Sequence, residues 1–233
     1  MKQQKLIVFD LDRTLADIGA GILPADIEAL KALERKGARI AICSGKPTYY
    51  LCGFMRQVGL EQPILVGENG AVIQMGVDLP PRDFYILPYS NDAKKSIKLL
   101  QRVLEEAMPW LWYQPNLVGL TPFPTGDKEF ARIEALIEQN RQEIRDLDIY
   151  RHVDSFDIVP NSISKRAGLE YLAKLVHIDA AHTAAVGDGI NDYPMFSYAG
   201  YRIGIGVAEP ERVDDNVGTC AEALTLLDKW LEA

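Results

Sequence analysis

The sequence has few cysteines, no long apolar run and no excess of positive charge. Its three cysteines, Cys43, Cys52 and Cys220, form an odd and unpatterned set, which argues against a disulfide framework and against a structural zinc site. No apolar run approaches the roughly 20 residues that a membrane-spanning helix needs, and the apolar stretch after Met1 is too short for a secretion signal. We therefore expect a soluble protein of the cytoplasm that has no membrane partner.

The charge balance is acidic, with a formal net charge of −8 and an isoelectric point of about 5.0. Such a surface repels nucleic acid and anionic lipid, so we expect neither as a partner. A small anionic substrate remains compatible with this balance if positive charge is concentrated locally. Hydrophobic residues make up 48% of the chain, as in ordinary globular proteins. We expect a monomer or a homodimer.

The pattern of apolar residues predicts an α/β core. Residues 6–9 form a continuous apolar run, which is typical of a strand that is buried on both faces. Residues 24–36 carry apolar side chains at helical spacing, and Gly37 follows where a helix commonly ends. The next predicted elements are a strand at 38–43, a helix at 47–58 and a strand at 64–66. This alternation predicts a mainly parallel sheet.

The alternation changes after Pro80 and Pro81 and resumes near residue 165. The elements predicted between are strands at 84–87, 110–113, 117–121 and 155–159, and helices at 92–108 and 128–140. Strands grouped between isolated helices are typical of an α+β unit. The later elements are helices at 165–176 and 221–231 and strands at 183–186 and 201–205. We therefore predict a Rossmann-like core of residues 1–81 and 160–233, with residues 82–159 inserted as an α+β cap domain.

Two carboxylates follow the first predicted strand, in Asp10-Leu11-Asp12-Arg13-Thr14. Ligands of open α/β sheets bind at the carboxyl ends of the strands. Asp10 and Asp12 would point to the same side of an extended backbone, because side chains alternate along a strand. A capped turn is the alternative, since Asp and Thr are common turn residues.

A second acidic segment, Gly187-Asp188-Gly189-Ile190-Asn191-Asp192, follows the strand at 183–186. Taken alone, it could be a tight turn. Acidic residues at two strand ends of one sheet would repel each other, so they need a counter-charge. The cluster predicted in this way contains Asp10, Asp12, Asp188 and Asp192. Ligands that are all oxygen favour Mg²⁺ over zinc, and we therefore predict a magnesium site.

Two further segments could bind an anion. Ser44 and Gly45 precede the helix at 47–58, where a hydroxyl and free backbone amides can bind a phosphate group. An ordinary serine cap of the helix is the alternative. Lys165 lies in a first helical turn, where its charge opposes the helix dipole. This position indicates another role, although a solvated surface lysine remains the alternative.

The order and spacing of these segments resemble the haloacid dehalogenase superfamily. Asp10-Leu11-Asp12-Arg13-Thr14 resembles its first motif, Ser44-Gly45 the second, Lys165 the third, and the segment from Gly187 to Asp192 the fourth. Gly67-Glu68-Asn69-Gly70-Ala71, with a cap between the second and third motifs, resembles the class that has the larger α+β cap. That class includes Cof-type sugar phosphatases, sucrose-phosphate phosphatase, mannosyl-3-phosphoglycerate phosphatase and archaeal phosphoglycolate phosphatase.

The resemblance implies a Mg²⁺-dependent phosphatase that hydrolyses a small phosphorylated metabolite of the sugar phosphate, phosphoglycolate or sugar-phosphoglycerate type. Asp10 would be the nucleophile that forms an aspartyl-phosphate, and Asp12 the general acid and base. Asp10, the backbone carbonyl of Asp12, and Asp188 would hold the metal ion, with Asp192 as a further member of the metal site that orients its waters or Lys165.

The remaining roles implied by the resemblance concern the phosphoryl group and its surroundings. Ser44, Gly45 and Lys165 would bind the phosphoryl oxygens. Thr14 would fix the loop of the first motif. Asn69 and Asn191 are further candidates for substrate binding, and Asn191 would also support the fourth motif. Arg13 departs from the glycine that is usual there, and its side chain either adds charge near the site or points to solvent.

Several alternatives remain open. A phosphomannomutase-like enzyme would return the phosphoryl group to a sugar and would need cap arginines for a second phosphate. The cap contains Arg132, Arg141, Arg145 and Arg151, in contexts typical of solvated side chains, so water is favoured as the acceptor. A non-catalytic phosphate- or sugar-binding protein would not need Asp10, Asp12 and Lys165 together. In the cap, Trp112, Tyr113 and Asn116 are candidates for substrate contact, with burial in the cap core as the alternative for the tryptophan.

Overall fold

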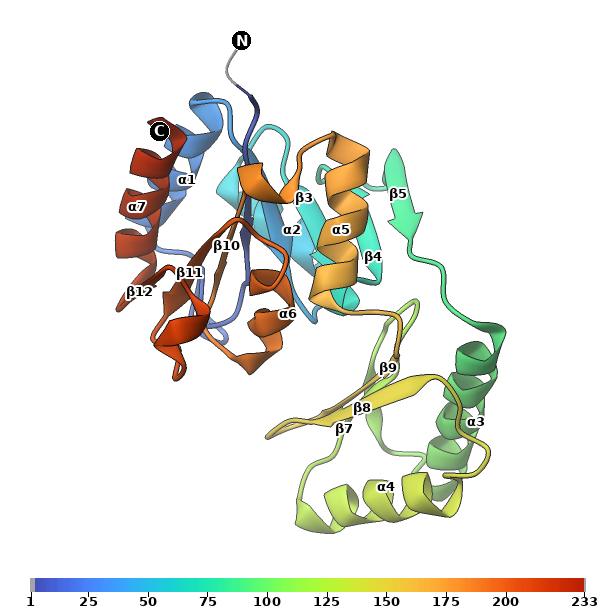
Figure 1. Cartoon of the computed structure of the whole chain (residues 1–233). Coiled ribbons are helices and arrows are strands. Elements are labelled where there is room, and N and C mark those ends of the chain that lie inside the picture. The colour runs from blue at the N-terminus through green and yellow to red at the C-terminus, as the bar shows by residue number, and fades with distance from the viewer. Residues whose placement is uncertain (1–2, 233) are drawn as a thin grey trace. The chain divides into compact units, whose positions relative to one another are not determined.

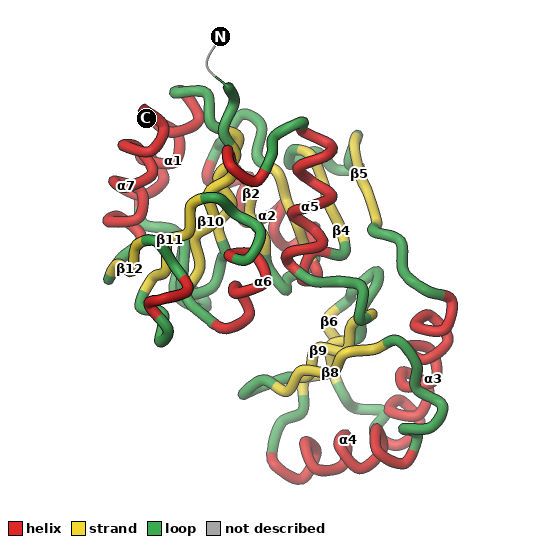
Figure 2. Tube along the Cα trace, viewed as in Figure 1, coloured by secondary structure: helices red, strands yellow, loops and turns green. Residues whose placement is uncertain are grey.

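The protein divides into two compact units in the computed structural model, which describes residues 3–232. The first unit consists of Met1–Ile86 and Ser164–Ala233, and the second is Leu87–Ile163. Figure 1 shows the course of the chain through both units, and Figure 2 shows their helices and strands. None of the helices within residues 3–232 is long and apolar enough to span a bilayer.

An eight-stranded sheet forms the centre of the first unit. Its strands are β1 (Leu6–Phe9), β2 (Arg39–Cys43), β3 (Ile64–Gly67), β4 (Val72–Met75), β5 (Asp83–Ile86), β10 (Thr183–Gly187), β11 (Tyr201–Ile205) and β12 (Asp215–Val217). They follow the order β12-β11-β10-β1-β2-β3-β4-β5. The pairs from β12 to β3 are parallel, and β4 is antiparallel to both of its neighbours. The carboxyl ends of β10, β1, β2 and β3 therefore meet at one edge of the sheet.

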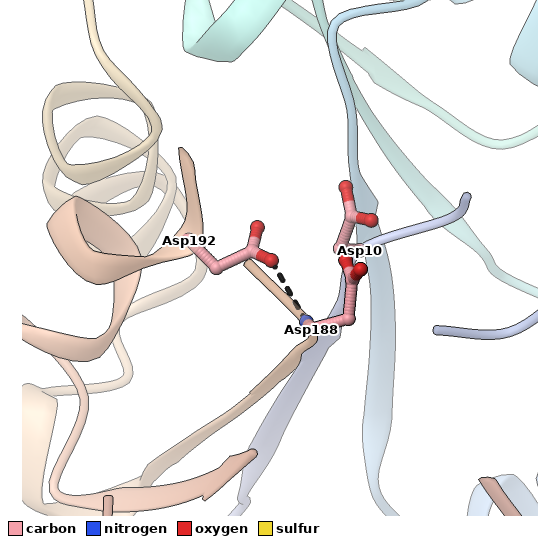
Figure 3. Close-up of side chains that lie close together, drawn as sticks. All are labelled: Asp10, Asp188 and Asp192. Carbon is pink, nitrogen blue, oxygen red and sulfur yellow. Dashed lines mark hydrogen bonds between the residues drawn. The ribbon is translucent and has the colours of Figure 1, made fainter. Parts of the chain in front are cut away.

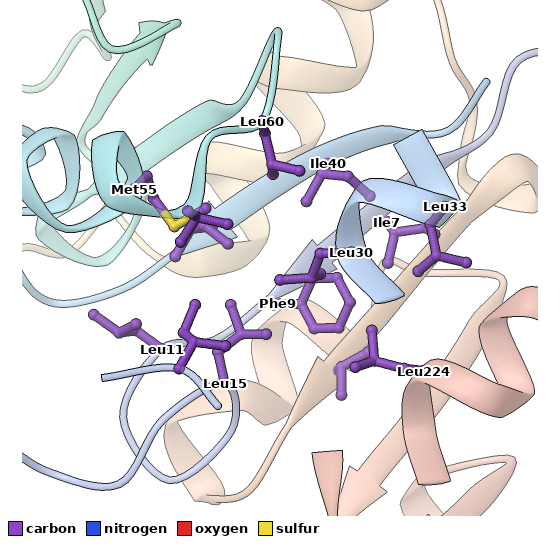
Figure 4. Close-up of a cluster of buried hydrophobic side chains, with 14 of the residues drawn as sticks. Ile7, Phe9, Leu11, Leu15, Leu30, Leu33, Ile40, Met55, Leu60 and Leu224 are labelled. Atoms are coloured by element: carbon purple, nitrogen blue, oxygen red, sulfur yellow. The ribbon is translucent and has the colours of Figure 1, made fainter. Parts of the chain in front are cut away.

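Helices cover both faces of this sheet (Figure 1). One face packs against α1 (Pro24–Arg35), α2 (Thr48–Val58) and α7 (Cys220–Glu232), and the other against α5 (Lys165–Val176) and α6 (Tyr193–Phe196). Ile7 and Phe9 of β1 are fully buried in the first layer beside Leu30, Leu33 and Leu224 (Figure 4). Full burial of one such side chain contributes about 1.5–3 kcal/mol. Burial on two faces explains why β1 is apolar without alternation, and the predicted α/β fold with a mainly parallel sheet is confirmed.

The second unit has an α+β composition and its own core. Its elements are α3 (Asn91–Ala107), β6 (Trp112–Gln114), β7 (Thr121–Phe123), α4 (Asp127–Gln139), β8 (Leu147–Arg151) and β9 (Phe156–Pro160). The strands form antiparallel pairs, β6 with β7 and β8 with β9, and a bridge between Leu120 and Ile158 links the two pairs. Leu100 and Leu104 of α3 pack with Ile133 of α4 in a separate buried cluster. We call this unit the cap.

The structure differs from the sequence-based expectations at the borders of the cap. The predicted insertion spans residues 82–159, whereas the compact unit begins at Leu87 and ends at Ile163. Asp83–Ile86 pairs with β4 as the edge strand β5 of the main sheet, because β4 offers it a free edge that the sequence of the segment does not reveal. The strand predicted at 117–121 begins only at Thr121.

Three strands had no counterpart in the predicted pattern: β4, β8 and β12. β8 alternates between polar and apolar residues and is at most half-buried, so it shows no apolar run. β4 carries the buried Gln74, whose side-chain amide donates hydrogen bonds to the carbonyls of Gly76 and Asp78 over 3.1 and 3.2 Å. Satisfied in this way, a polar residue can occupy the interior of a sheet.

Candidate active site

Parallel pairing brings the chemically interesting segments to one edge of the main sheet. β1 lies between β10 and β2, so Asp10 at the end of β1 lies between Asp188 after β10 and Ser44 after β2. Lys165 opens α5, because the hydroxyl of Ser164 caps that helix by accepting a hydrogen bond from the Ala167 amide over 3.1 Å. Ligands of open α/β sheets bind at such an edge.

Asp10, Asp188 and Asp192 form an acidic cluster (Figure 3), in which one carboxylate oxygen of each lies within 4.8 Å of the others. Asp10 is 4% exposed and Asp192 is fully buried, while Asp188 is partly buried. Carboxylates that are this close and this buried require a positive partner. A set of oxygen donors suits a hard divalent cation. The cluster could therefore hold a divalent metal ion.

Lys165 supplies part of this positive charge. Its side chain is 2% exposed, and its ammonium group donates hydrogen bonds to Oδ1 of Asp10 over 2.5 Å and to Oδ1 of Asp192 over 2.6 Å. Oδ2 of Asp192 accepts the backbone amides of Asp188 and Gly189 over 2.9 and 3.1 Å. Both oxygens of Asp192 are thus engaged in holding Lys165 and the turn after β10. Asp10 and Asp188 keep oxygens that can face an ion.

Gly187 permits this turn. A Cβ atom at that position would lie 2.4 Å from the carboxylate of Asp192, which is closer than non-bonded atoms approach. A glycine at the end of β10 therefore lets Asp192 fold back over the strand and reach the amides that it binds. The glycine that suggested only a turn in the sequence is needed for the close approach of an acidic side chain.

The pKa values of Asp10 and Asp188 are raised although Lys165 lies beside the cluster, so its single positive charge does not fully offset burial and the other carboxylates. Burial raises the pKa of Asp10 from 3.8 to about 7, with Lys165 opposing and Asp192 reinforcing the rise. Burial and the charge of Asp192 also raise the pKa of Asp188, against the opposing charges of Arg13 and Lys165. Burial would lower the pKa of Lys165, but Asp10 and Asp192 outweigh it and raise the pKa above its ordinary value. A bound divalent cation would favour the ionised form of Asp10.

The carboxylate of Asp12 occupies a different environment. It is about one-third exposed, and its Oδ2 lies 3.4 Å from Nζ of Lys46. Among the residues that the structure describes, the acidic cluster contains Asp10, Asp188 and Asp192 but not the Asp12 side chain. The Asp12 side chain lies apart from the other three because Asp12 is past the strand end, where the backbone no longer alternates. That Asp12 contributes its backbone carbonyl to a metal site, as the resemblance implies, stays a prediction.

Ser44, Gly45 and Asn69 lie side by side. Ser44 is buried, and its carbonyl accepts a hydrogen bond from the Asn69 amide over 3.0 Å. A Cβ atom on Gly45 would lie 3.3 Å from Oδ1 of Asn69. Asn69 adopts a left-handed conformation with a φ of 56°, which Asn tolerates better than most residues. The loop after β3 therefore supports the segment that could bind a phosphate group.

The same loop packs against the start of α5. A Cβ atom on Gly70 would lie 2.2 Å from the carbonyl oxygen of Ser164, and one on Gly168 would lie 2.6 Å from Cα of Gly70. This close backbone contact requires glycine on both sides. The contact therefore fixes the first turn of α5 relative to the loop that contains Asn69. The backbone of Lys165, which begins α5, is fixed with it.

The other predicted residues occupy distinct places. Thr14 is buried and its hydroxyl has no hydrogen-bond partner among the described residues, whereas Asn191 is exposed. In the cap, Trp112 is 59% exposed and packs edge-on against Phe123, so it does not belong to the cap core. Asn116 donates a hydrogen bond to the hydroxyl of Thr121 over 2.9 Å.

Sequence reasoning missed Lys46 and Glu68. Lys46 directly follows Ser44 and Gly45, and this adjacency is the one signal that could have identified it. Glu68 is buried and has a φ of 52°, and its amide donates a hydrogen bond to the carbonyl of Lys46 over 3.0 Å. The burial of Glu68 depends on the conformation of the loop after β3, which no local sequence pattern predicted.

Comparisons with known proteins identify the family of the chain. The family model described as haloacid dehalogenase-like hydrolase matches residues 7–116 and 120–216. A phosphoglycolate phosphatase from Metallosphaera sedula is 28% identical, over 89% of this chain and 87% of that protein. An HMP-PP phosphatase from Yersinia enterocolitica is 25% identical, over 98% of this chain and 96% of that protein.

A solved structure shares the fold. It is a haloacid dehalogenase-like hydrolase from Bacteroides thetaiotaomicron, with a TM-score of 0.76 and 19% identity, over 97% of this chain and 100% of that chain. The resemblance drawn from the sequence motifs is thereby confirmed. The chain belongs to the haloacid dehalogenase-like hydrolase family, and it is a phosphatase of that family.

Proposed function

We propose that the protein is a Mg²⁺-dependent phosphatase that hydrolyses a small phosphorylated metabolite through an aspartyl-phosphate on Asp10. The observation that carries this proposal is the buried contact of Lys165 with Asp10, 2.5 Å long, inside a cluster of carboxylates that could hold a divalent ion. This contact supports the proposal because the charge of Lys165 favours the ionised form of Asp10, which is the form that would attack a phosphoryl group.

In the first step, a carboxylate oxygen of Asp10 attacks phosphorus, and the bond from phosphorus to the leaving-group oxygen breaks. Asp12 donates a proton to that oxygen, which leaves as an alcohol. Ser44, the amide of Gly45 and Lys165 bind the oxygens of the phosphoryl group and stabilise the charge that spreads over them. A bound Mg²⁺ would supply further positive charge to these oxygens and keep Asp10 ionised.

In the second step, Asp12 accepts a proton from a water molecule that attacks phosphorus of the aspartyl-phosphate. The acyl-phosphate bond breaks, inorganic phosphate is released and the Asp10 carboxylate is restored. The two aspartates suit these different roles because Asp10 is buried beside Lys165, whereas Asp12 is about one-third exposed. Different environments allow two carboxyl groups to act as nucleophile and as acid.

Phosphate release from a panel of phosphate monoesters tests this function. We expect turnover with Mg²⁺, little turnover with EDTA, and none in Asp10→Asn. Asp17→Asn serves as the matched control, because Asp17 is exposed and lies outside the acidic cluster. An Asp10→Asn variant that turns over at the native rate would refute the proposal, as would a folded native protein that releases no phosphate from any ester.

A further inference from the structure

A pocket of about 500 Å³ lies at the end of the main sheet that is opposite to Asp10. Arg39, which begins β2, and Asp83, which begins β5, both line it. Because β2 runs parallel to β1, the start of β2 lies at the opposite edge of the sheet from the end of β1 that precedes Asp10. All lining residues belong to the first unit. The volume falls in the range of small-molecule sites, and no residue of the candidate active site lines the pocket.

Hydrogen bonds within the protein hold the wall of this pocket. The carboxylate of Glu34 accepts hydrogen bonds from the amides of Glu61 and Gln62 over 2.9 and 3.0 Å, which fixes the turn before β3. The amide of Gly76 donates a hydrogen bond to the carbonyl of Pro63 over 2.8 Å, which joins the segment after β4 to the same turn. A wall that is already ordered lowers the entropic cost of binding a small molecule.

Arg39 has no counter-charge in this pocket. Its side chain is partly exposed and lines the pocket, whereas its Nε is shielded from solvent and has no hydrogen-bond partner among the described residues. Ile40, the next residue along β2, is buried in the layer beside α1, so Arg39 points to the other face of the sheet, which α5 covers. A guanidinium that is partly removed from water without an acceptor is unfavourable. An anionic group in the pocket would supply that acceptor.

The other charged residues of the lining are Glu61, Asp83 and Arg82. Arg82 pairs with Asp78 over 3.0 Å, whereas Glu61 and Asp83 are exposed, and neither carboxylate forms an ion pair among the residues that the structure describes. The lining therefore offers one cation and two carboxylates that lack a partner of opposite charge. A ligand with negative charge alone would be repelled by both carboxylates, whereas a zwitterion can use all three charges.

The spacing of these charges sets the length of the ligand. Arg39 and Asp83 lie on β2 and β5, and these strands are separated by β3 and β4. Three strand spacings put their backbones about 14 Å apart, so their charged ends suit a ligand whose own charges are several atoms apart. Met75 of β4 and Leu175 of α5 line the same pocket, and these side chains offer apolar contact to the body of such a ligand.

We propose that this pocket is a second ligand site of the protein, for a linear zwitterion with a carboxylate and an ammonium group at opposite ends of a short methylene chain. The carboxylate accepts hydrogen bonds from Arg39, and the ammonium group pairs with Asp83, while Glu61 adds negative potential. The ligand class is that of the ω-amino acids. The site is independent of the proposed phosphatase function, because it uses none of the residues assigned to phosphoryl transfer.

Four matched compounds test the site by calorimetric titration. ε-Aminocaproate carries its two charges at opposite ends, its isomer norleucine carries both at the same end, and caproate and hexylamine carry one charge each. We expect one ε-aminocaproate to bind per chain, with a Kd at least about 10-fold lower than those of the other three, as expected for one more contact between charged groups. Absence of binding, or an equal Kd for any of the other three compounds, would overturn the proposal.

Variants of the lining test which residues bind the ligand. Arg39→Met should raise the Kd of ε-aminocaproate by at least about 10-fold. It should leave the thermal stability equal or higher, because it replaces a cation that has no partner by an apolar side chain. Asp83→Asn should weaken the binding of ε-aminocaproate but not that of caproate. Arg35→Met is the matched control and should keep the native Kd, because Arg35 is exposed at the end of α1 and does not line the pocket.

Asp10→Asn tests where the ligand binds, and this variant should bind ε-aminocaproate with the native Kd. Loss of binding in Asp10→Asn would place the ligand at the candidate active site and overturn the proposal, as would native binding by Arg39→Met. A native protein that releases no phosphate from any ester contradicts the proposed function but not this site, because the readout here is binding.

Discussion

Lys165 donates a hydrogen bond of 2.5 Å to Asp10 although 155 positions separate the two residues in the chain. Asp10 ends β1 before the cap, and Lys165 opens α5 after it. The pair therefore joins the two chain segments of the first unit, and it does so where burial is nearly complete. Function and folding of this unit should both depend on it.

Replacing Lys165 tests that dependence. Lys165→Met leaves the buried carboxylates of Asp10 and Asp192 without their cation, and breaking a buried pair in this way typically costs about 3–5 kcal/mol. We expect a large loss of stability in EDTA, partly restored by Mg²⁺, together with loss of phosphatase activity. Denaturant unfolding with EDTA and with Mg²⁺ measures both states. Unchanged stability in EDTA would contradict the electrostatic account of the site.

Asp12 and Asp188 should respond differently to substitution. Asp12→Asn should lower turnover by about 10²–10⁴-fold, as loss of a general acid and base does, while the stabilisation by Mg²⁺ remains. Asp188→Asn should lose both turnover and the stabilisation by Mg²⁺, because Asp188 lies in the acidic cluster and the Asp12 side chain does not. Thermal unfolding at increasing Mg²⁺ distinguishes them. Equal loss of Mg²⁺ stabilisation in both variants would place the Asp12 carboxylate on the metal.

The raised pKa of Asp10 predicts how metal-free stability varies with pH. Between 3.8 and about 7 the folded state holds the Asp10 proton more tightly than the unfolded state does. The contribution of Asp10 to stability therefore falls as the pH rises through this window, and is lowest above about 7. Mg²⁺ competes with that proton, so its stabilising effect should grow over the same window.

Unfolding of the native protein and of Asp10→Asn in EDTA, from pH 5 to pH 8, measures this contribution as the difference between the two. We expect the native protein to lose stability relative to the variant as the pH rises. A difference that stays constant, or one that changes in favour of the native protein, would show that Asp10 is ionised in the metal-free fold throughout.

Substitutions at two glycines with positive φ values distinguish the cost of backbone strain from the cost of a steric clash. Gly70 has a φ of 102°, and a Cβ there would lie 2.2 Å from the Ser164 carbonyl, whereas Gly76 has a φ of 76° and open space around it. Gly76→Ala should cost about 1 kcal/mol from strain alone. Gly70→Ala should cost more and should also lower kcat, because it displaces the start of α5 and Lys165. Equal costs with native kcat would mean that the contact does not position the lysine.

Some elements and candidate residues could be recognised from a local pattern in the sequence. β1 can be recognised in the sequence as an apolar run, because both of its faces are buried. Asp10 can be recognised as a candidate because it is an acidic residue directly after that run. Lys165 taken alone could be a solvated surface lysine, and Asp10 and Asp12 taken alone could belong to a capped turn. Their roles were predicted only from the order of the four motifs, which resembles the family.

Features that depend on distant partners could not be predicted in this way. β5 is an edge strand only because β4 offers it a free edge. The separation of Asp12 from the cluster, and its contact with Lys46, depend on how two loops after different strands are folded. Asp192 binds Lys165 with one oxygen and two amides with the other, a division of tasks that the sequence of the turn does not specify.

The most direct test of the account is rapid-mixing kinetics of Asp12→Asn with p-nitrophenyl phosphate, whose leaving group needs no proton. Because Asp12 would then be missing only from the second step, the aspartyl-phosphate should accumulate. We predict a burst of about one nitrophenolate per chain, as for a covalent intermediate, with the phosphoryl group on Asp10 in acid-quenched peptides. Continued turnover without a burst and without label on Asp10 would contradict the central claim.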